Sequence, residues 1–347
     1  MKIIIDVNHP GHVHLFKNFA FQAKEKGWNV LFTAKDKEVT IDLLKAYRLN
    51  YKNLGGHYSG TLGKIYSLFL HVWRLFFISV RFQPDLYLSH GSVPASWVSF
   101  LLRKKYIAFE DTGNMEQIRL YKPFADAILT TVSFKKDFGK IHVRYNGYHE
   151  IAYLHPNYFK PNPEIFRFLN IDENEKYFIL RFISWGASHD VGQGGLNLQQ
   201  KRKIVNLLTK HGKVFISSEA LLPEDLKTFQ IKIPPEKMHD ALYYAQMFVG
   251  EGATMASECA VLGTPAVYIN SMIAETITEQ QNYGLLFHFT SPDGVIEKIQ
   301  ELLNTENLKQ IWKKRHNKML SEKIDVTAFL MDFVERFNKI ELKVRIN

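Results

Sequence analysis

Residues 250–265 read GEGATMASECAVLGTP and lie between two short apolar runs, residues 247–249 and 266–269. This order predicts strand, turn, helix and strand, because the apolar runs have strand length and the glycines mark turns. The small residues at 252 and 253 would let a phosphate approach the unpaired amides of the first helical turn, where the helix dipole favours an anion. Glu258 follows about one turn further in. The segment therefore predicts a phosphate site with a carboxylate nearby.

The same alternation of strand and helix extends over the rest of the chain. An apolar run at 2–7 precedes the turn Asn8-His9-Pro10-Gly11 and a helical repeat that ends near Gly27. Parallel strands need long crossover connections, which helices supply, so the series predicts an α/β fold. After the proline-containing stretch 155–163 a second series starts at 177–182. We expect two Rossmann-like domains facing each other across a cleft, at 1–160 and 161–325, and a C-terminal helix within 326–347 that packs back on the first domain.

Composition narrows the class of ligand. The chain has 44 Lys and Arg against 35 Asp and Glu, a formal net charge of +9, which favours an anionic ligand or surface. It has no zinc-knuckle spacing, RNA-binding aromatic motif or Arg-rich arm, so no nucleic-acid partner is expected. The single cysteine, Cys259, cannot form an intrachain disulfide, and an apolar strand follows Met1-Lys2 without a signal-peptide pattern. These features predict a cytoplasmic protein that binds an anionic small molecule.

The spacing of Glu258, Gly263 and Pro265 resembles the GT-B superfamily, in which a Gly-rich turn, a helix bearing Glu and a following Gly-x-Pro form the nucleotide-sugar half of the cleft. Residues 6–14, 184–195 and 233–265 together are similar to an uncharacterised archaeal and bacterial family of GT-B-like proteins related to UDP-N-acetylglucosamine 2-epimerases. The resemblance covers nearly the whole chain. It implies an enzyme whose substrate is a nucleotide-sugar, with UDP as the expected nucleotide, and which requires no cofactor.

The resemblance also implies where the nucleotide-sugar binds. The base would lie against the segment 233–239, the diphosphate against the loop 183–195 and the first turn after Gly252, and the ribose against Glu258. The alternatives are a surface loop at 183–195 and a solvated helix position for Glu258. The residues expected to bind the donor are Arg181, Ser184, Trp185, Met238, Ala253, Thr254 and Glu258.

The candidate catalytic residues follow predicted strands of the first domain. His12 and His14 lie after the first strand, and imidazoles of near-neutral pKa suit the deprotonation of an acceptor hydroxyl. Glu110 resembles an acidic residue that the 2-epimerases carry after a strand, whereas Ser92 stands where their pattern has an acid. The alternative for the histidines is a helix cap and core packing. No metal is expected, because neither a Cys pair nor a helical His-Glu-x-x-His pattern is present.

These features predict a glycosyltransferase that moves a sugar from a UDP-sugar to a polysaccharide or lipid-linked acceptor, in polysaccharide biosynthesis. The alternatives are a nucleotide-sugar 2-epimerase or hydrolase of the same fold, or a non-catalytic nucleotide-sugar-binding protein. The apolar segment 62–82 also carries Lys64, Arg74 and Arg81. We expect this helix to pack against a sheet, and the alternative is peripheral contact with the inner face of a membrane.

Overall fold

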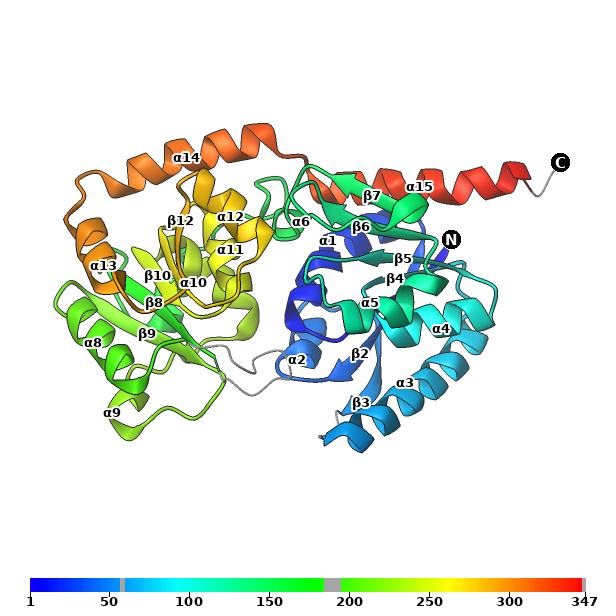
Figure 1. Ribbon diagram of the computed structural model, residues 1–347, viewed down its shortest axis with the longest axis horizontal. Helices are drawn as coiled ribbons and strands as arrows, with labels where there is room; N and C mark the ends of the chain where they lie inside the picture. Colours follow the sequence, from blue (N-terminus) through cyan, green and yellow to red (C-terminus); the bar gives the residue numbers. More distant parts are fainter. Residues whose placement is uncertain (57–59, 184–194, 345–347) are drawn as a thin grey trace. The chain divides into compact units, whose positions relative to one another are not determined.

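The chain forms two compact units, each built on a parallel sheet. The computed structural model describes residues 1–56, 60–183 and 195–344. Unit 1 comprises Met1–Tyr158 and Ile324–Asn347, and unit 2 comprises Phe159–Lys323. Helices surround the sheet of each unit, which confirms the predicted α/β fold class (Figure 1).

Within the described residues, the sheet of unit 1 has seven strands in the order β3-β2-β1-β4-β5-β6-β7. Neighbouring strands pair in parallel. Ile3, Ile4 and Ile5 of the central strand β1 are completely buried, as expected where helices cover both faces of a sheet. The strands are β1 (Lys2–Val7), β2 (Asn29–Asp36), β3 (Tyr51–Gly56), β4 (Leu86–His90), β5 (Lys105–Phe109), β6 (Ala127–Thr131) and β7 (His142–Tyr145).

The helices of unit 1 form two groups. One group packs around α1 (Pro10–Glu25) and consists of α2 (Thr40–Ala46), α6 (Ile151–Leu154) and α15 (Val326–Val344). Thr327 of α15 donates a hydrogen bond to the Ala152 carbonyl at 2.7 Å, so the last helix is fixed to unit 1. The other group shares a core cluster with Ile4 and Tyr87 and consists of α3 (Gly60–Phe82), α4 (Val93–Leu101) and α5 (Met115–Tyr121).

The part of unit 2 that the structure describes contains a five-stranded sheet in the order β12-β11-β10-β8-β9. Its strand pairs are parallel. The strands are β8 (Tyr177–Phe182), β9 (Lys213–Ser218), β10 (Met247–Gly250), β11 (Ala266–Ile269) and β12 (Leu286–Phe289). The helices are α7 (Ile165–Leu169), α8 (Leu198–Leu208), α9 (Glu224–Lys227), α10 (Met238–Tyr244), α11 (Ala253–Leu262), α12 (Glu275–Asn282), α13 (Val295–Asn304) and α14 (Leu308–Glu322).

The segment 250–265 has the predicted order of strand end, turn, helix and strand. Gly250 ends β10, and a Cβ atom there would lie 2.7 Å from the Arg181 carbonyl oxygen of β8, so only glycine fits this strand pairing. Gly263 ends α11 in the left-handed conformation with φ 76°, the usual glycine stop of a helix. Two glycines thus mark the ends of the turn-and-helix segment that carries Glu258.

The expectation that the apolar helix 62–82 packs against the sheet holds for one side of the helix only, where Leu75 is fully buried and Leu68 and Phe76 pack on the core cluster of unit 1. The stretch Leu62–Phe82 of α3 is long and apolar enough to cross a membrane by length and composition, yet only 22% of its most apolar window is buried. Its inward side carries Ser67, His71 and Ser79, whereas Phe69 and Trp73 are about 60% exposed. The sequence is apolar around the helix, so its pattern could not indicate which side faces the sheet.

Ser92 links the start of α4 to a buried acid of β1. Its hydroxyl accepts a hydrogen bond from the Ala95 amide at 3.2 Å and donates to Asp6 at 2.5 Å. Thr33 donates to the other oxygen of Asp6 at 2.6 Å. Burial raises the pKa of Asp6, while nearby Lys35 and the two hydroxyl donors lower it. The serine at this position therefore serves a structural hydrogen-bond network.

Replacing Ser92 tests this network. Ser92→Ala removes the helix cap and one donor to a buried carboxyl, so we expect the free energy of unfolding to fall by about 2 kcal/mol in urea denaturation. Ser99→Ala is the matched control in the same helix, because the Ser99 hydroxyl only donates back to the Ser96 carbonyl. The control should lose less than about 1 kcal/mol. Equal losses for the two variants would contradict the assigned role.

Candidate active site

The carboxyl ends of β1, β4 and β5 bring polar residues together in unit 1. The order of the sheet reverses between β1 and β4, and ligands of open α/β sheets bind outside the carboxyl ends at such a point. His12 lies in the first turn of α1, which follows β1, and His90 is the last residue of β4. Asp111 follows β5. The elements of the fold therefore place two imidazoles and a carboxylate at one edge.

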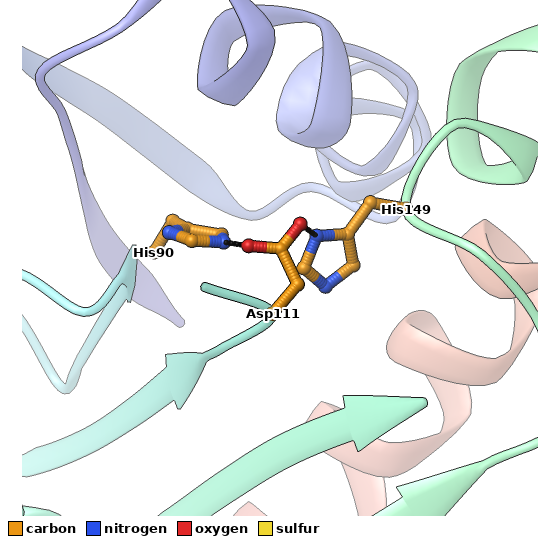
Figure 2. A group of neighbouring side chains, drawn as sticks. All are labelled: His90, Asp111 and His149. Atoms are coloured by element: carbon orange, nitrogen blue, oxygen red, sulfur yellow. Dashed lines mark hydrogen bonds and ion pairs between the residues drawn. The ribbon is translucent and has the colours of Figure 1, made fainter. Parts of the chain in front are cut away.

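Asp111 lies between two buried histidines (Figure 2). Its Oδ1 is 2.8 Å from His90 Nε2, and its Oδ2 is 3.0 Å from His149 Nδ1. The side chains of His90 and His149 are 9% and 8% exposed, whereas that of Asp111 is 37% exposed. The carboxylate thus reaches from a more open loop to satisfy one nitrogen of each buried imidazole.

Within this trio, Asp111 and His90 shift each other's pKa. Burial opposes ionisation of Asp111, but His90 and then His149 outweigh it and hold the pKa of the carboxyl well below its usual value. Burial likewise lowers the pKa of His90, yet Asp111 raises it to about 9. The result near pH 7 is an imidazolium paired with a carboxylate.

His12 stacks on His90 and has the opposite protonation state. The ring centroids are 4.4 Å apart with an interplanar angle of 23°. Burial, followed by the neighbouring His90, lowers the pKa of His12 well below its usual value. Its Nδ1 atom has no hydrogen-bond partner among the described residues. A neutral imidazole, the form that can accept a proton, therefore lies beside a protonated one.

The structure gives His14 a different setting. It is buried, its Nδ1 lies 3.3 Å from the Tyr47 hydroxyl, and its ring stacks on Tyr153 at 5.3 Å between centroids. Tyr153 belongs to α6, and Tyr47 ends α2. His14 therefore packs between helices and does not join the cluster of His12 and His90.

Glu110 shapes the loop that carries Asp111. Its Oε1 accepts hydrogen bonds from the Thr112 amide, the Thr112 hydroxyl and the Gly113 amide at 2.7–2.9 Å. Its Oε2 accepts a hydrogen bond from the Tyr121 hydroxyl at 2.6 Å. With both oxygens engaged and 2% exposure, Glu110 positions the loop, and its neighbour Asp111 contacts the histidines.

Three residues of this cluster, His90, Asp111 and His149, were not among the predicted site residues. Asp111 shares the predicted acidic loop with Glu110, but sequence does not tell which of two adjacent carboxylates turns inward. His149 follows β7, four strands away from β1 in the sheet order, and reaches Asp111 from a turn before α6. The only sequence signal for His149 is a polar residue shortly after a strand, which many surface residues share.

The trio also offers ligands for a metal ion. One ligand atom from each of His90, Asp111 and His149 lies within 4.8 Å of the others. Two imidazoles and a carboxylate suit divalent transition metals, and an ion would replace the protons that now join the carboxylate to the imidazoles. The same residues could therefore hold a metal or a shared proton, and experiment can separate the two.

In unit 2 the corresponding point of sheet reversal lies between β8 and β10. The helix α11 starts there with Gly252 as its N-cap, and among the described residues no side-chain cap hydrogen bond is present. Ala253 is half-buried and Thr254 is exposed. Anion binding at the first turn of α11 stays a prediction, to which this helix start is suited.

The other predicted donor-binding residues of unit 2 have partners. Arg181 donates to Ser217 at 2.8 Å and to Glu219 at 2.6 Å. Glu258 is 5% exposed and lies 3.0 Å from His239 Nε2 of α10. Met238 begins α10 and is half-buried, whereas Ser184 and Trp185 lie outside the described residues. The pairing of Glu258 with His239 fixes α11 to the helix that would hold the base.

A buried carboxylate of unit 2 was not predicted. Glu251 is completely buried and accepts hydrogen bonds from the Ile183 amide at 3.2 Å and the Leu196 amide at 2.8 Å. Lys201 pairs with it at 3.0 Å. Glu251 thereby ties together the two ends of the loop that the sequence assigns to the diphosphate. The loop itself, 184–194, lies outside the described residues.

Solved structures of similar fold identify the fold class. S. aureus MnaA in its co-structure with UDP has a TM-score of 0.68 and 13% identity, with 97% of this chain and 96% of that chain covered. SsfS6, a glycosyltransferase of Streptomyces sp. SF2575, has a TM-score of 0.61 and 13% identity, with 96% and 99% covered. UDP-GlcNAc 2-epimerase from Neisseria meningitidis bound to UDP-GlcNAc has a TM-score of 0.59 and 13% identity, with 92% and 100% covered. The chain therefore has the GT-B fold of glycosyltransferases and UDP-GlcNAc 2-epimerases.

Sequence comparison identifies the family. The chain belongs to the family described as protein of unknown function (DUF354), which matches residues 1–339. The uncharacterized protein MJ0665 of Methanocaldococcus jannaschii is 24% identical over 284 residues, covering 77% of this chain and 81% of the relative. These matches confirm the family resemblance seen in the sequence.

The Asp111 pairing predicts the titration of His90. In Asp111→Asn the burial of His90 is no longer opposed by a carboxylate, so we expect its pKa to fall from about 9 to the ordinary range of an imidazole or below. NMR titration of assigned histidine Cε1 resonances measures this change. Asp137→Asn, which removes the partner of His142 at 2.9 Å, is the matched control and should leave His90 unchanged. A His90 titration that is the same in all three proteins would contradict the pairing.

Proposed function

We propose that the chain is a glycosyltransferase that transfers a sugar from a UDP-sugar to a hydroxyl of a polysaccharide or lipid-linked acceptor. Unit 2 binds the donor and unit 1 supplies the acid–base groups. The observation that carries the proposal is the neutral His12 ring stacked at 4.4 Å on His90, which Asp111 holds protonated. The GT-B fold, shared with nucleotide-sugar enzymes, gives this pair its substrate class.

In the proposed reaction the neutral imidazole of His12 takes the proton of the acceptor hydroxyl. The acceptor oxygen forms a bond to the anomeric carbon as the bond from that carbon to the diphosphate oxygen breaks. UDP leaves with the bonding electron pair, and His12 later releases its proton to solvent. The reaction is a displacement without a redox step, so it needs one base and stabilisation of the departing diphosphate.

The donor-binding half of the proposal rests on α11. The uncapped amides near Ala253 and Thr254 would receive the diphosphate, with Arg181 as a nearby cation. Glu258 would accept hydrogen bonds from the ribose hydroxyls, with His239 holding the carboxylate in position. The base would lie against the start of α10 at Met238. Ser184 and Trp185 stay predicted diphosphate contacts.

A second candidate is epimerisation or hydrolysis of the nucleotide-sugar. It is favoured by the number of acid–base groups gathered in unit 1, since His12, His90, Asp111 and His149 exceed what simple transfer requires. Ser92 argues against it, because its hydroxyl is bonded to Asp6 where the epimerase pattern has an acid. Donor incubated alone and followed by NMR of the sugar separates the candidates, since only the second reaction proceeds without acceptor.

The role of His12 is tested by UDP release from a panel of UDP-sugars with acceptor extracts. His12→Asn removes the proposed base, so we expect kcat to fall by about 10²–10⁴-fold with little change in KM for the donor. His142→Asn is the control, because this buried histidine of the same unit pairs with Thr130 and Asp137 instead. Because the proposed reaction uses no metal ion, the activity should survive EDTA. Full activity of His12→Asn would contradict the proposal, and a loss with EDTA that zinc restores would assign the trio to a metal.

Donor binding is tested separately by calorimetry with UDP. Glu258→Gln keeps the side-chain shape but removes the charge, so we expect the Kd for UDP to rise by about 10–100-fold, the worth of a charge-assisted hydrogen bond. Glu224→Gln is the matched control on an exposed helix of unit 2, where Glu224 pairs only with Lys227 three residues on. Unaltered UDP affinity in Glu258→Gln would overturn the ribose assignment. Binding without turnover across the panels would support a non-catalytic protein.

A further inference from the structure

The helix α3 carries polar residues along its most buried line and large apolar residues on its exposed side. Four residues spaced four apart face the interior, namely Ser67, His71, Leu75 and Ser79, and each is at most 3% exposed. Three of these four are polar. Burial lowers the pKa of His71 to about 4, so this inward imidazole is neutral. The interior contact of α3 accounts for Leu75 and its half-buried apolar neighbours, but not for the apolar residues on the exposed side of the helix.

The outward side carries the large apolar residues. Leu62, Phe69 and Trp73 are 84%, 60% and 61% exposed. Together with the exposed Ile65, Tyr66, Phe77 and Val80 they recur every three to four residues, which is the spacing of one helix face. We define the apolar ridge as the exposed residues Leu62, Ile65, Tyr66, Phe69, Trp73, Phe77 and Val80 of α3 with Phe100 and Leu101 of α4.

The neighbouring helix α4 widens this surface. It packs beside α3 (Figure 1). The rings of Phe69 and Trp97 are 6.3 Å apart. Phe100 and Leu101 at its end are each 61% exposed. Single exposed apolar residues are normal on a protein surface, but a group along two adjacent helices marks an interaction site.

Charge indicates the partner. Residues 60–105 contain six basic residues, Lys64, Arg74, Arg81, Arg103, Lys104 and Lys105, and one acidic residue, Asp85. Asp85 already accepts a hydrogen bond from the Lys2 amide at 2.7 Å. Lys64 and Arg81 are exposed near the two ends of the α3 face, and Arg103 and Lys104 are exposed just after α4. A basic border without a free acid is complementary to an anionic surface, whereas a second copy would present the same positive charge.

We propose that the apolar ridge docks on the leaflet of a phospholipid bilayer that contains anionic lipid. Its Trp, Tyr and Phe side chains enter the boundary between headgroups and acyl chains, and the flanking Lys and Arg side chains contact lipid phosphates. The helix lies in the plane of the surface and does not span it, because Leu75 is fully buried and Leu68, Val72 and Phe76 pack on the core cluster of unit 1. The docking does not depend on the proposed transfer reaction, but it would bring a lipid-linked acceptor to the same unit.

The test is flotation of the full chain with vesicles of phosphatidylcholine alone or with 30% phosphatidylglycerol, a composition set at roughly the anionic content at which basic surfaces bind. We expect binding to the anionic vesicles only, weakened by raised salt. Phe69→Ser with Trp73→Ser should reduce the bound fraction at least tenfold, and Lys64→Glu with Arg81→Glu should do the same. The control is Phe21→Ser with Ile273→Ser, which replaces exposed apolar residues of α1 and of unit 2 and should bind as the wild type does.

Each outcome of this test has a clear meaning. Absence of vesicle binding by the wild type, or equal binding by the ridge and control variants, overturns the proposal. Light scattering of the same proteins completes it, since a wild-type dimer that the ridge substitutions convert to a monomer would assign the ridge to a second copy instead. Circular dichroism confirms that the variants are folded. UDP affinity of the ridge variant should equal that of the wild type, so failure of docking and failure of donor binding are distinguishable.

Discussion

One carboxylate holds together the acid–base chemistry of the first unit. Asp111 accepts from both His90 and His149, and both imidazoles are less than one-tenth exposed. Burial alone would keep such rings neutral, and an unpaired charge among them would be costly. The shared carboxylate reverses this for His90, and the positive charge of His90 in turn helps to keep the stacked His12 neutral. His90 can thus act as a proton donor and His12 as a proton acceptor. The two histidines differ because His90 pairs directly with Asp111, whereas His12 stacks on His90.

The fold could be predicted because its determinants are local. Apolar runs alternate with helical repeats, and the glycines at 250 and 263 mark the ends of a strand and a helix that the sequence already showed. The position of the candidate site at the edge of the first sheet was predictable for the same reason, since His12 follows the first strand. Which carboxylate enters that edge was not predictable, because the amides of Thr112 and Gly113 capture Glu110 and leave its neighbour free to turn inward. The approach of His149 to Asp111 could be predicted only from the order of the strands in the sheet, which no local sequence pattern contains.

The helix α3 shows the limit of hydrophobic patterning. A segment that is apolar around most of its circumference predicts a helix, yet the side facing the sheet depends on tertiary packing. Here Ser67, His71 and Ser79 turn inward, whereas Phe69, Trp73 and Phe77 are exposed. Similarly, the pairing of Glu258 with His239 joins two helices of unit 2, and a sequence offers no sign that these two residues meet.

The dependence of kcat/KM on pH tests the central account most directly, because it reports the free enzyme's acid and base together. His12 must be unprotonated, and its pKa lies well below 6.5, so activity should persist to acidic pH. His90 must stay protonated to orient and polarise the pair that it forms with His12. Activity should therefore fall as pH rises through about 9. The account predicts a plateau between these limits whose alkaline edge moves to lower pH in Asp111→Asn. A single transition near the ordinary histidine pKa, unchanged in that variant, would contradict it.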